Sequence, residues 1–414
     1  MSALIDQAAR ARAAWQDFQG AGEAVKNKAL QNMIGQLAAR SQDILAANAL
    51  DVAAAAEKGL AQSFVERLTL NEHRLAGIAE GLADVIALSD PVGEVIEQWT
   101  RPNGLVIVKR RVPLGVVGII YESRPNVTVD AAALCLKSGN AAILRGGSDA
   151  LMSNGALIGA LRAAIEDAGL NPDLISLVED PSRETAKQLM TLNRYVDVLI
   201  PRGGKGLIRS VVESATVPVI QTGDGVCHIY VDGQCDAAMA REIAVSAKVS
   251  RPSVCNSAET LLVDAAIAPD FLPGCLDELR EKGVEIRGCE RTRALWPDAL
   301  PATDDDWDAE YNAPIYAVRV VGGVDEAIDH INAHGTRHSE AIVTANAGRA
   351  AAFQTRVDAA AVYVNASTRF TDGYEFGLGA EIGISNQKLH ARGPMGLREL
   401  TTYKYEITGD GQTR

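Results

Sequence analysis

The feature of this 414-residue sequence that most constrains its fold is a regular alternation of apolar, β-rich runs with helical stretches, which begins at Val116. In a first block, the apolar runs predict strands at residues 116–121, 141–144, 174–178, 196–200 and 217–220. The stretches between them, among them 127–137 and 149–168, have helical periodicity. Such alternation predicts a parallel sheet with crossover helices, because parallel strands need a long return connection.

The alternation restarts after Asp232. In this second block we expect strands at residues 259–263, 315–320, 340–344 and 361–364, and helices at 236–248, 270–282, 324–334 and 346–356. A chain of this length exceeds one ordinary hydrophobic core. The sequence therefore predicts two α/β domains, with a boundary near residue 230. The Gly-rich tail, 365–414, is too long for an ordinary loop, so we expect it to be functional or to pack on a partner subunit.

Residues 1–88 lack this alternation, and their pattern predicts a series of Ala-rich amphipathic helices. Between residues 94 and 111, apolar and polar side chains alternate on both sides of Pro102-Asn103-Gly104. An Asn-Gly pair between alternating runs is typical of a β-hairpin turn. We therefore expect a hairpin to separate the helices from the first parallel sheet.

Charge and cysteine usage exclude several classes of protein. The formal net charge of −13 disfavours nucleic acid as a partner, because neutralising phosphates takes clustered Lys and Arg. No run of 18 or more apolar residues predicts a membrane span, and the charged N-terminus lacks the apolar core of a secretory signal. Six scattered cysteines without a C-x-x-C pair predict neither a disulfide framework nor a zinc site. These features favour a cytoplasmic protein with reduced thiols.

Two segments repeat one local design, in which a strand is followed by Arg, two glycines and a helix. The first contains Arg145-Gly146-Gly147 and the second Arg202-Gly203-Gly204-Lys205. Glycines at such a turn let a ligand approach the backbone, and the helix N-terminus favours an anion such as a cofactor phosphate. The alternative is a pair of tight turns with solvated arginines. No G-x-G-x-x-G fingerprint accompanies them, so an ordinary dinucleotide site is not predicted.

Cys255 is the candidate nucleophile. It lies between a predicted helix and a predicted strand among small polar residues, and Arg251 nearby favours a thiolate. Cys135, by contrast, lies in an apolar helix and is interpreted as a core residue. The competing interpretation of Cys255 is also structural, since a lone cysteine usually is.

Three histidines, His330, His334 and His338, recur at a spacing of four residues, which resembles a metal-ligand ladder on one helical face. Gly335-Thr336 interrupts the helix before His338, and no carboxylate completes a known spacing. We therefore favour capping or hydrogen-bonding roles for these residues and predict no metal site.

At this point the motifs resemble a known family. The Arg-Gly-Gly turns, Cys255 and the segment 310–314 (Glu-Tyr-Asn-Ala-Pro) resemble the aldehyde dehydrogenase superfamily. Within it, several stretches resemble the gamma-glutamyl phosphate reductase family, namely residues 121–126, 327–340, 364–370, 377–385 and 388–397. The resemblance covers nearly the whole chain, and its motifs in the tail are highly specific.

The resemblance implies an aldehyde-dehydrogenase-like fold. It implies a Rossmann-like NADPH-binding domain over residues 1–230 and an α/β catalytic domain over 231–364 that carries Cys255. The tail, 365–414, would return to the active site and the oligomer interface. The hairpin near 94–111 and the strand-like segment 401–407 resemble the oligomerisation elements of the superfamily, so a homodimer or larger homo-oligomer is expected.

The resemblance also implies roles for individual residues. Cys255 matches the nucleophile, and Ser123 and Asn126 are candidates for the donor to the oxyanion, beside the backbone N–H of Cys255. The residues that would bind the cofactor are Arg145, Gly146, Gly147, Ser148, Arg202, Gly203, Gly204, Lys205 and Glu310. Ser148 stands where many NAD-using relatives carry a Glu, which suits the 2′-phosphate of NADPH.

For the substrate, the candidates are Arg124, Arg251 and Arg369, each in a family-like motif. Hydrolytic members of the superfamily carry a Glu that activates water, and Gln221 stands in that place here. Because Gln cannot act as a general base, a thioester would survive until it is reduced.

Together these residues predict an NADPH-dependent reduction of L-glutamyl 5-phosphate to L-glutamate 5-semialdehyde and phosphate, in proline biosynthesis. Glutamate 5-kinase, which makes the acyl phosphate, is the expected protein partner. The alternative is a hydrolytic NAD(P)-dependent semialdehyde dehydrogenase, against which Gln221 and Ser148 argue. A catalytically inactive scaffold protein is a more distant alternative, disfavoured by the intact Cys255 and Glu310.

Overall fold

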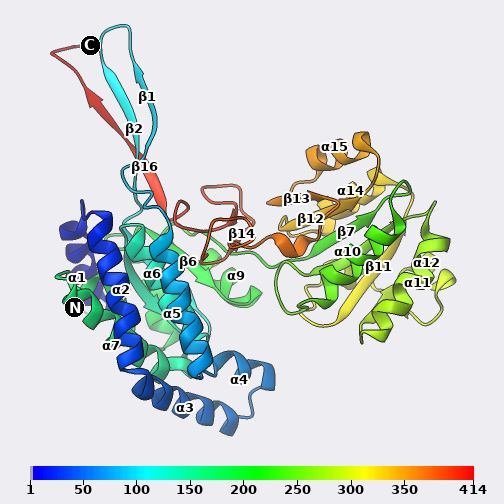
Figure 1. The fold of residues 1–414 in the computed structure, drawn as a ribbon, viewed down its shortest axis with the longest axis horizontal. Coiled ribbons are helices and arrows are strands. Elements are labelled where there is room, and N and C mark those ends of the chain that lie inside the picture. The colour runs from blue at the N-terminus through cyan, green and yellow to red at the C-terminus, as the bar shows by residue number, and fades with distance from the viewer. Residues whose placement is uncertain (1–2) are drawn as a thin grey trace. The chain divides into compact units, whose positions relative to one another are not determined.

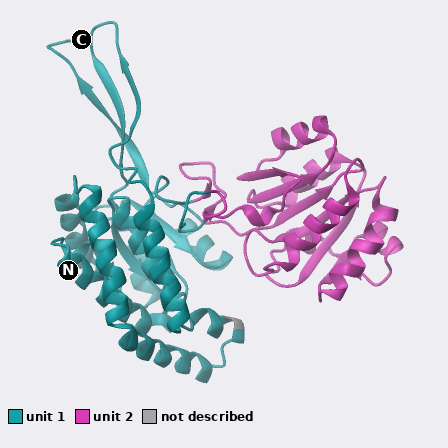
Figure 2. Cartoon of the chain, in the orientation of Figure 1, with its two compact units in different colours: residues 1–221, 377–383, 395–414 teal, residues 222–376, 384–394 magenta. Residues whose placement is uncertain are grey.

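The computed structural model, which describes residues 3–414, divides into two units (Figure 2). Unit 1 contains the chain up to Gln221 together with residues 377–383 and 395–414. Unit 2 contains residues 222–376 and 384–394. The C-terminal tail therefore contributes segments to both units. Each unit contains a parallel sheet with crossover helices, so the predicted α/β fold class is confirmed.

Unit 1 begins with the predicted series of helices. They are α1 (Ala3–Phe18), α2 (Glu23–Ala39), α3 (Ser41–Glu57), α4 (Gln62–Leu68) and α5 (Glu72–Ala87). In α5 the side chain of Asn71 accepts a hydrogen bond from the backbone N–H of Arg74 at 2.8 Å and so caps the helix. Leu75, Ile78, Leu82 and Val85 recur at helical spacing and are buried, which fixes the face that packs inward.

The parallel sheet of unit 1 has the strand order β5-β4-β3-β6. Its strands are β3 (Val116–Tyr121), β4 (Ala141–Arg145), β5 (Ile175–Leu177) and β6 (Val198–Arg202). Every residue of β3 is buried, because helices cover parallel strands on both faces. The helices that follow the strands are α6 (Pro125–Lys137), α7 (Leu151–Asp167), α8 (Arg183–Leu189) and α9 (Lys205–Ser214), and η1 (Ser148–Ala150) and η2 (Pro172–Leu174) are single 3₁₀ turns.

One predicted strand of this block is wrong. Residues 217–220 form only an isolated bridge between Val219 and Leu199. Pro218 has no N–H to donate to a neighbouring strand, which prevents a continuous ladder there.

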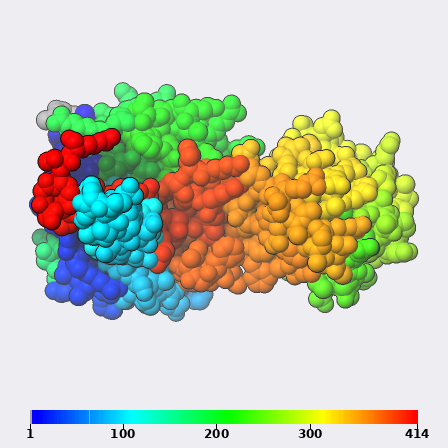
Figure 3. Space-filling view, turned by 90° about the horizontal axis from the view of Figure 1, so that it is seen from above, coloured from blue at the N-terminus to red at the C-terminus, as the bar shows by residue number. Residues whose placement is uncertain are grey.

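A three-stranded antiparallel sheet projects from unit 1 (Figure 1). The predicted hairpin is confirmed as β1 (Val95–Thr100) and β2 (Val106–Pro113), and Gly104 has a φ of 89° at the turn. The C-terminal strand β16 (Thr401–Thr408) pairs along the other side of β2, and the red and cyan segments lie side by side on the surface (Figure 3). We call this three-stranded sheet the arm.

Unit 2 contains a seven-stranded parallel sheet of order β10-β9-β11-β8-β7-β12-β13. Its strands are β7 (Cys227–Val231), β8 (Ala258–Asp264), β9 (Glu285–Gly288), β10 (Leu300–Pro301), β11 (Ile315–Val321), β12 (Ser339–Val343) and β13 (Ala361–Val364). The helices are α10 (Ala237–Val249), α11 (Ala268–Glu281), α12 (Glu290–Leu295), α13 (Asp304–Trp307), α14 (Val324–His334) and α15 (Ala347–Arg356), followed by the 3₁₀ turn η3 (Thr368–Phe370). Two short tail strands, β14 (Ile384–Ser385) and β15 (Gly393–Pro394), pair with each other.

Successive side chains along the unit 2 strands belong to two separate hydrophobic cores. Ile229 and Leu261 belong to the cluster that packs against α10 and α11, whereas Tyr230 and Leu262 belong to the cluster that packs against α14 and α15. Successive residues of a strand point to opposite faces, so the sheet is covered on both sides (Figure 1). Within residues 3–414, no helix combines the length and the apolarity that crossing a membrane requires.

Candidate active site

The two Arg-Gly-Gly turns lie at one edge of the unit 1 sheet. Arg145 is the last residue of β4 and Arg202 the last residue of β6, and these strands flank β3. In the register, Arg145 pairs with Ile120 and Arg202 with Tyr121. Because the carboxyl ends of parallel strands share an edge, the sheet brings both arginines together there, where α/β proteins bind nucleotides.

Close packing explains the glycines of these turns. A Cβ on Gly147 would lie 2.6 Å from Oγ of Ser123, and one on Gly203 would lie 2.7 Å from the carboxyl carbon of Glu122. The backbone N–H of Gly204 donates to Oε1 of Glu122 at 2.9 Å. Glu122, which the sequence motifs did not single out, therefore places a carboxylate at the N-terminus of α9, where the helix dipole favours an anion.

Charges around the first turn are partly balanced. The guanidinium of Arg145 donates to the carbonyl of Pro181, which ties it to the loop after β5. Ser148 is exposed, and the adjacent Asp149 forms an ion pair with Lys58, whose Nζ lies 2.7 Å from Oδ1. The carboxylate beside Ser148 is therefore countered by a cation.

Ser123, Arg124 and Asn126 lie together where β3 leads into α6. Ser123 is buried, Arg124 is the N-cap residue of α6, and Asn126 is exposed in its first turn. The amide of Asn126 donates to Oδ2 of Asp130 at 3.1 Å, and burial raises the pKa of Asp130 to about 6. The two candidate oxyanion donors and one candidate substrate arginine thus belong to unit 1.

Cys255 belongs to unit 2, in the turn between α10 and β8, and is half-buried. Arg251 lies in the same turn, and Arg369 comes from η3 in the tail. The guanidinium of Arg369 donates to Oδ1 of Asn256 and, at 3.1 Å, to Oγ of Ser250. Burial lowers the pKa of Arg369, and the charge of Arg251 lowers it further. Two arginines close enough to repel each other beside a thiol form a suitable site for an anion.

The backbone of Cys255 is tightly packed. A Cβ on Gly225 would lie 1.5 Å from the carbonyl oxygen of Cys255, so this position accommodates no side chain. The N–H of Gly225 donates to Oε1 of Glu310 at 2.8 Å. Glu310, the predicted ligand of the nicotinamide ribose, therefore accepts a hydrogen bond from the same glycine that packs against the candidate nucleophile.

A buried ion pair supports the segment that carries Glu310. Lys248 and Glu259 are both fully buried and form an ion pair. Burial raises the pKa of Glu259 to about 7, although Lys248 opposes this shift. The free oxygen of Glu259 accepts from the backbone N–H of Asn312 at 3.3 Å, and Asn312 has a φ of 52°. A buried lysine with its own carboxylate was not predicted from the sequence.

Other cysteines have environments unlike that of Cys255. Cys135 and Cys275 are buried in α6 and α11, and burial raises the pKa of each thiol to about 12. Cys235 is half-buried, and burial raises its pKa to about 11. These thiols remain protonated near neutral pH and are poor nucleophiles.

The three histidines do not form one ladder. The rings of His330 and His334 on α14 have centroids 4.5 Å apart and are tilted by 40°, and Nδ1 of His334 lies 2.9 Å from a carboxylate oxygen of Asp308. His338 follows the end of α14, and its Nδ1 lies 2.8 Å from Oγ of Ser339. Among the residues that the structure describes, no three His, Cys, Asp or Glu side chains are grouped so as to hold a metal ion.

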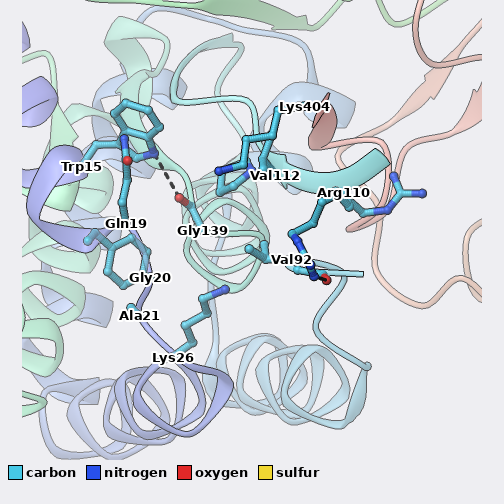
Figure 4. Close-up of a pocket in the computed structure, with 14 residues that line it drawn as sticks. Trp15, Gln19, Gly20, Ala21, Lys26, Val92, Arg110, Val112, Gly139 and Lys404 are labelled. Atoms are coloured by element: carbon cyan, nitrogen blue, oxygen red, sulfur yellow. Dashed lines mark hydrogen bonds between the residues drawn. The ribbon is translucent and has the colours of Figure 1, made fainter. Parts of the chain in front are cut away.

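A cavity of about 360 Å³ lies elsewhere in unit 1, at the base of the arm (Figure 4). Trp15 lines it and donates from its indole N–H to the carbonyl of Gly139 at 3.1 Å. Lys26 also lines it and pairs with Asp90 at 2.8 Å. None of the candidate site residues lines this cavity, so it is separate from the candidate active site.

Comparison with known proteins identifies the class. The sequence profile of the aldehyde dehydrogenase family matches residues 1–287 and 298–404. Because this match covers more than half of the chain, the protein is a member of the aldehyde dehydrogenase family.

Curated relatives and solved structures narrow the class. The gamma-glutamyl phosphate reductase of Moorella thermoacetica is 59% identical over 405 residues, which cover 98% of this chain and 97% of the relative. That of Clostridium beijerinckii is 56% identical over 100% of both chains. The crystal structure of gamma-glutamyl phosphate reductase from Thermotoga maritima has a TM-score of 0.98 at 50% identity, with 100% of both chains covered. The chain belongs to the gamma-glutamyl phosphate reductase family.

Proposed function

We propose that this chain reduces L-glutamyl 5-phosphate to L-glutamate 5-semialdehyde and phosphate with NADPH, in proline biosynthesis, through a thioester on Cys255. The observation that carries the proposal is the setting of Cys255, a half-buried thiol with a clamped backbone and two neighbouring arginines. Relatives 50–59% identical over nearly their whole length are named for this activity, which supports it.

The charges near Cys255 suit this substrate. L-Glutamyl 5-phosphate has a carboxylate and a phosphate, and a guanidinium can bind either group with two parallel hydrogen bonds. Arg251 and Arg369 are the proposed ligands in unit 2, and Arg124 is the proposed ligand in unit 1.

In the first half of the reaction, the thiolate of Cys255 attacks the 5-carbonyl carbon of the substrate. The bond from that carbon to the phosphate oxygen breaks, and phosphate leaves with the electron pair, which gives a thioester. Negative charge develops on the carbonyl oxygen in this step. The proposed donors to it are the backbone N–H of Cys255 and the side chain of Ser123 or Asn126, because positioned donors stabilise such charge without reorganising.

Membership of the aldehyde dehydrogenase family implies a nicotinamide cofactor, and the residues of this chain fit one. When bound, NADPH supplies the hydride that reduces the thioester carbon. The groups that would hold its phosphates are Arg145, Arg202 and Lys205, with the glycines Gly146, Gly147, Gly203 and Gly204 leaving room for them. Glu310 would hold the nicotinamide ribose. The ion pair of Asp149 with Lys58 removes a repulsion that a 2′-phosphate near Ser148 would meet.

Collapse of the resulting thiohemiacetal returns the thiolate of Cys255 and releases the aldehyde. Gln221 protects the thioester before that step, because its amide cannot remove a proton from water. The absence of a base at this position favours reduction over hydrolysis.

We also propose that the arm mediates self-association, to a homodimer or a larger assembly. Its outer strands, β1 and β16, are sheet edges, and their unpaired backbone groups favour pairing with another chain. The exposed apolar side chains of the arm are Val95, Ile96, Tyr403, Tyr405 and Ile407. We further propose glutamate 5-kinase as a protein partner and the cytoplasm as the location of this chain, since the acyl phosphate has to be supplied where it is consumed. Light scattering of the purified chain tests the assembly.

The reverse reaction tests the proposed chemistry. The chain is given L-glutamate 5-semialdehyde and NADP, with and without phosphate, and NADPH formation is followed. We expect phosphate-dependent NADPH formation, and its loss by orders of magnitude in Cys255→Ala. Cys235→Ala, which removes another half-buried thiol of unit 2, is the matched control and should retain most activity. Retention of more than about a tenth of kcat by Cys255→Ala contradicts the covalent mechanism.

A further inference from the structure

A second thiol lies behind the candidate nucleophile. Cys227, the first residue of β7, is fully buried. Its Sγ is 3.2 Å from the carbonyl oxygen of Cys255, to which the thiol donates a hydrogen bond. Sγ also lies 3.8 Å from Nδ1 of His338, which is within hydrogen-bonding range for sulfur. The buried thiol therefore contacts the backbone of the nucleophile on one side and a histidine on the other.

The direction of these hydrogen bonds follows from counting hydrogens. Ser339 has one hydroxyl hydrogen, which it donates to Oγ1 of Thr371 at 2.6 Å. Its oxygen must therefore accept from Nδ1 of His338 at 2.8 Å, so that nitrogen carries a proton. The same N–H faces Sγ of Cys227, which is left free to donate its own hydrogen to Cys255. The network thus runs in one direction, from the imidazole through the thiol to the carbonyl.

The thiol of Cys227 keeps its hydrogen. Burial, with a further contribution from the charge of Glu340, raises the pKa of Cys227 well above its usual range. A thiol that stays protonated at neutral pH is a constant donor and a poor nucleophile. The two cysteines in contact therefore have different chemistry, since Cys255 is half-buried beside Arg251.

The bond from Cys227 is one part of a clamp on the main chain around the nucleophile. Gly225 packs against the same carbonyl of Cys255. The next carbonyl, that of Asn256, accepts from Oγ1 of Thr368 at 2.8 Å. Because a peptide unit is planar, fixing the carbonyl at Cys255 fixes the plane that follows its Cα and limits the direction in which its side chain points. Displacing a reacting atom by about 1 Å can cost roughly 10²-fold in rate.

We propose that Cys227 is a positioning residue for Cys255: its buried thiol, oriented by His338, holds the Cys255 carbonyl and so aims the Cys255 sulfur at the acyl carbon of the substrate. This inference rests on the proposed function, in which Cys255 is the nucleophile. Cys227 itself touches neither substrate nor cofactor in this role.

Three substitutions at Cys227 distinguish the effect of its hydrogen-bond donor from the effect of its side-chain volume. Cys227→Ser keeps a donor, Cys227→Val fills the space without one, and Cys227→Ala removes both. Cys275→Ala is the matched control, since it removes a fully buried thiol of unit 2 that lies in the core around α11. The kcat and KM values of the reverse reaction are measured for each variant, together with the pH profile of Cys255 alkylation by iodoacetamide, read by peptide mass spectrometry.

A positioning role has a defined signature. We expect Cys227→Ala and Cys227→Val to lower kcat roughly 10- to 100-fold with KM within about threefold, because a misdirected nucleophile reacts slowly with substrate that still binds. Cys227→Ser should recover kcat to within about threefold of the unaltered chain. The midpoint of the alkylation profile should stay unchanged in every variant, since Cys227 acts through geometry and not through charge.

Other outcomes overturn the inference. It is wrong if Cys227→Val has the kcat of Cys275→Ala, or if the serine and valine variants are equally impaired. It is equally wrong if only KM changes, or if the alkylation midpoint moves. Should Cys227→Ala fail to fold, the comparison of Ser with Val still decides. Failure of the proposed function is distinct, because it is recognised by an active Cys255→Ala.

Discussion

One methyl group at Gly225 offers a direct test of the clamp on the nucleophile. In Gly225→Ala the new Cβ would lie 1.5 Å from the carbonyl oxygen of Cys255 and 2.4 Å from its carbonyl carbon. Both are main-chain atoms, which no change of rotamer can move. Real Cβ contacts essentially never fall below 3.0 Å, so the carbonyl has to recede by 3.0 − 1.5, or about 1.5 Å.

This displacement has consequences for rate and for stability. The side chain of Cys255 moves with its backbone, and a misplacement of about 1 Å can cost roughly 10²-fold, so kcat should fall by roughly 10²-fold or more. Crowding a packed site should also lower the free energy of unfolding by about 1–3 kcal/mol. The N–H of Gly225 would shift relative to Glu310 as well, and the KM for NADP should then rise.

The assay combines the reverse reaction with urea unfolding. Gly274→Ala is the control, because its Cβ would lie 3.6 Å from a guanidinium nitrogen of Arg241, an ordinary contact, within α11. It should retain kcat and unfold at an equal or higher urea concentration, since Ala favours a helix over Gly. If Gly225→Ala has kcat within about threefold of this control and equal stability, the close approach of Gly225 to Cys255 is refuted.

Three further predictions concern other residues. Arg145→Ala should reduce the preference for NADPH over NADH roughly 10- to 100-fold, because a charge-assisted contact is worth about 1.5–3 kcal/mol; an unchanged ratio of kcat/KM values would move that contact elsewhere. Gln221→Glu should form glutamate from semialdehyde and NADP in phosphate-free buffer, since a general base is worth about 10²–10⁴-fold; mass spectrometry that finds no increase across about pH 6–9 would contradict this. Burial lowers the pKa of His330 to about 2. As the pH falls below about 6.5, the unfolded chain therefore takes up a proton at this histidine while the folded chain does not, and the folded state loses stability. In urea unfolding between about pH 6 and 5, His330→Leu should make this loss of stability smaller by about 1.2 kcal/mol, and an identical slope would refute it.

Most of the fold could be predicted because its strands are locally distinct. The run 116–121 is wholly buried in the structure, and a continuous apolar run bounded by turn residues is the usual sign of such a strand. The unit 2 strand Cys227–Val231, which lies between β8 and β12, was not predicted. It contains the buried polar residue His228 and follows a segment with two glycines, so the sequence resembled a boundary between domains. The pairing of residues 401–408 with residues 106–113 was not predicted, since no local pattern joins strands almost 300 residues apart.

The candidate site was predictable where its residues are close in sequence. Arg251 and Cys255 share one turn, and Arg145 with its glycines forms one motif. The contacts of Gly225 and Cys227 with Cys255 were not predictable, because they depend on two strand ends meeting in the folded sheet. The two glycines of Gly223-Asp224-Gly225 were the available signal, since a glycine beside a strand often marks a close backbone approach.

The distribution of cations explains how a chain with a net charge of −13 can bind anionic ligands. Its overall field repels anions, but at physiological ionic strength that field is screened beyond about 8 Å. Binding therefore depends on charges within contact range, and the arginines are placed accordingly, with Arg251 and Arg369 beside Cys255 and Arg145 and Arg202 at the unit 1 sheet edge. The proposed substrate and cofactor both carry phosphate, which a guanidinium binds with directed hydrogen bonds as well as charge. The acidic balance of the remaining surface does not oppose this recognition, and it supports solubility through self-repulsion between copies.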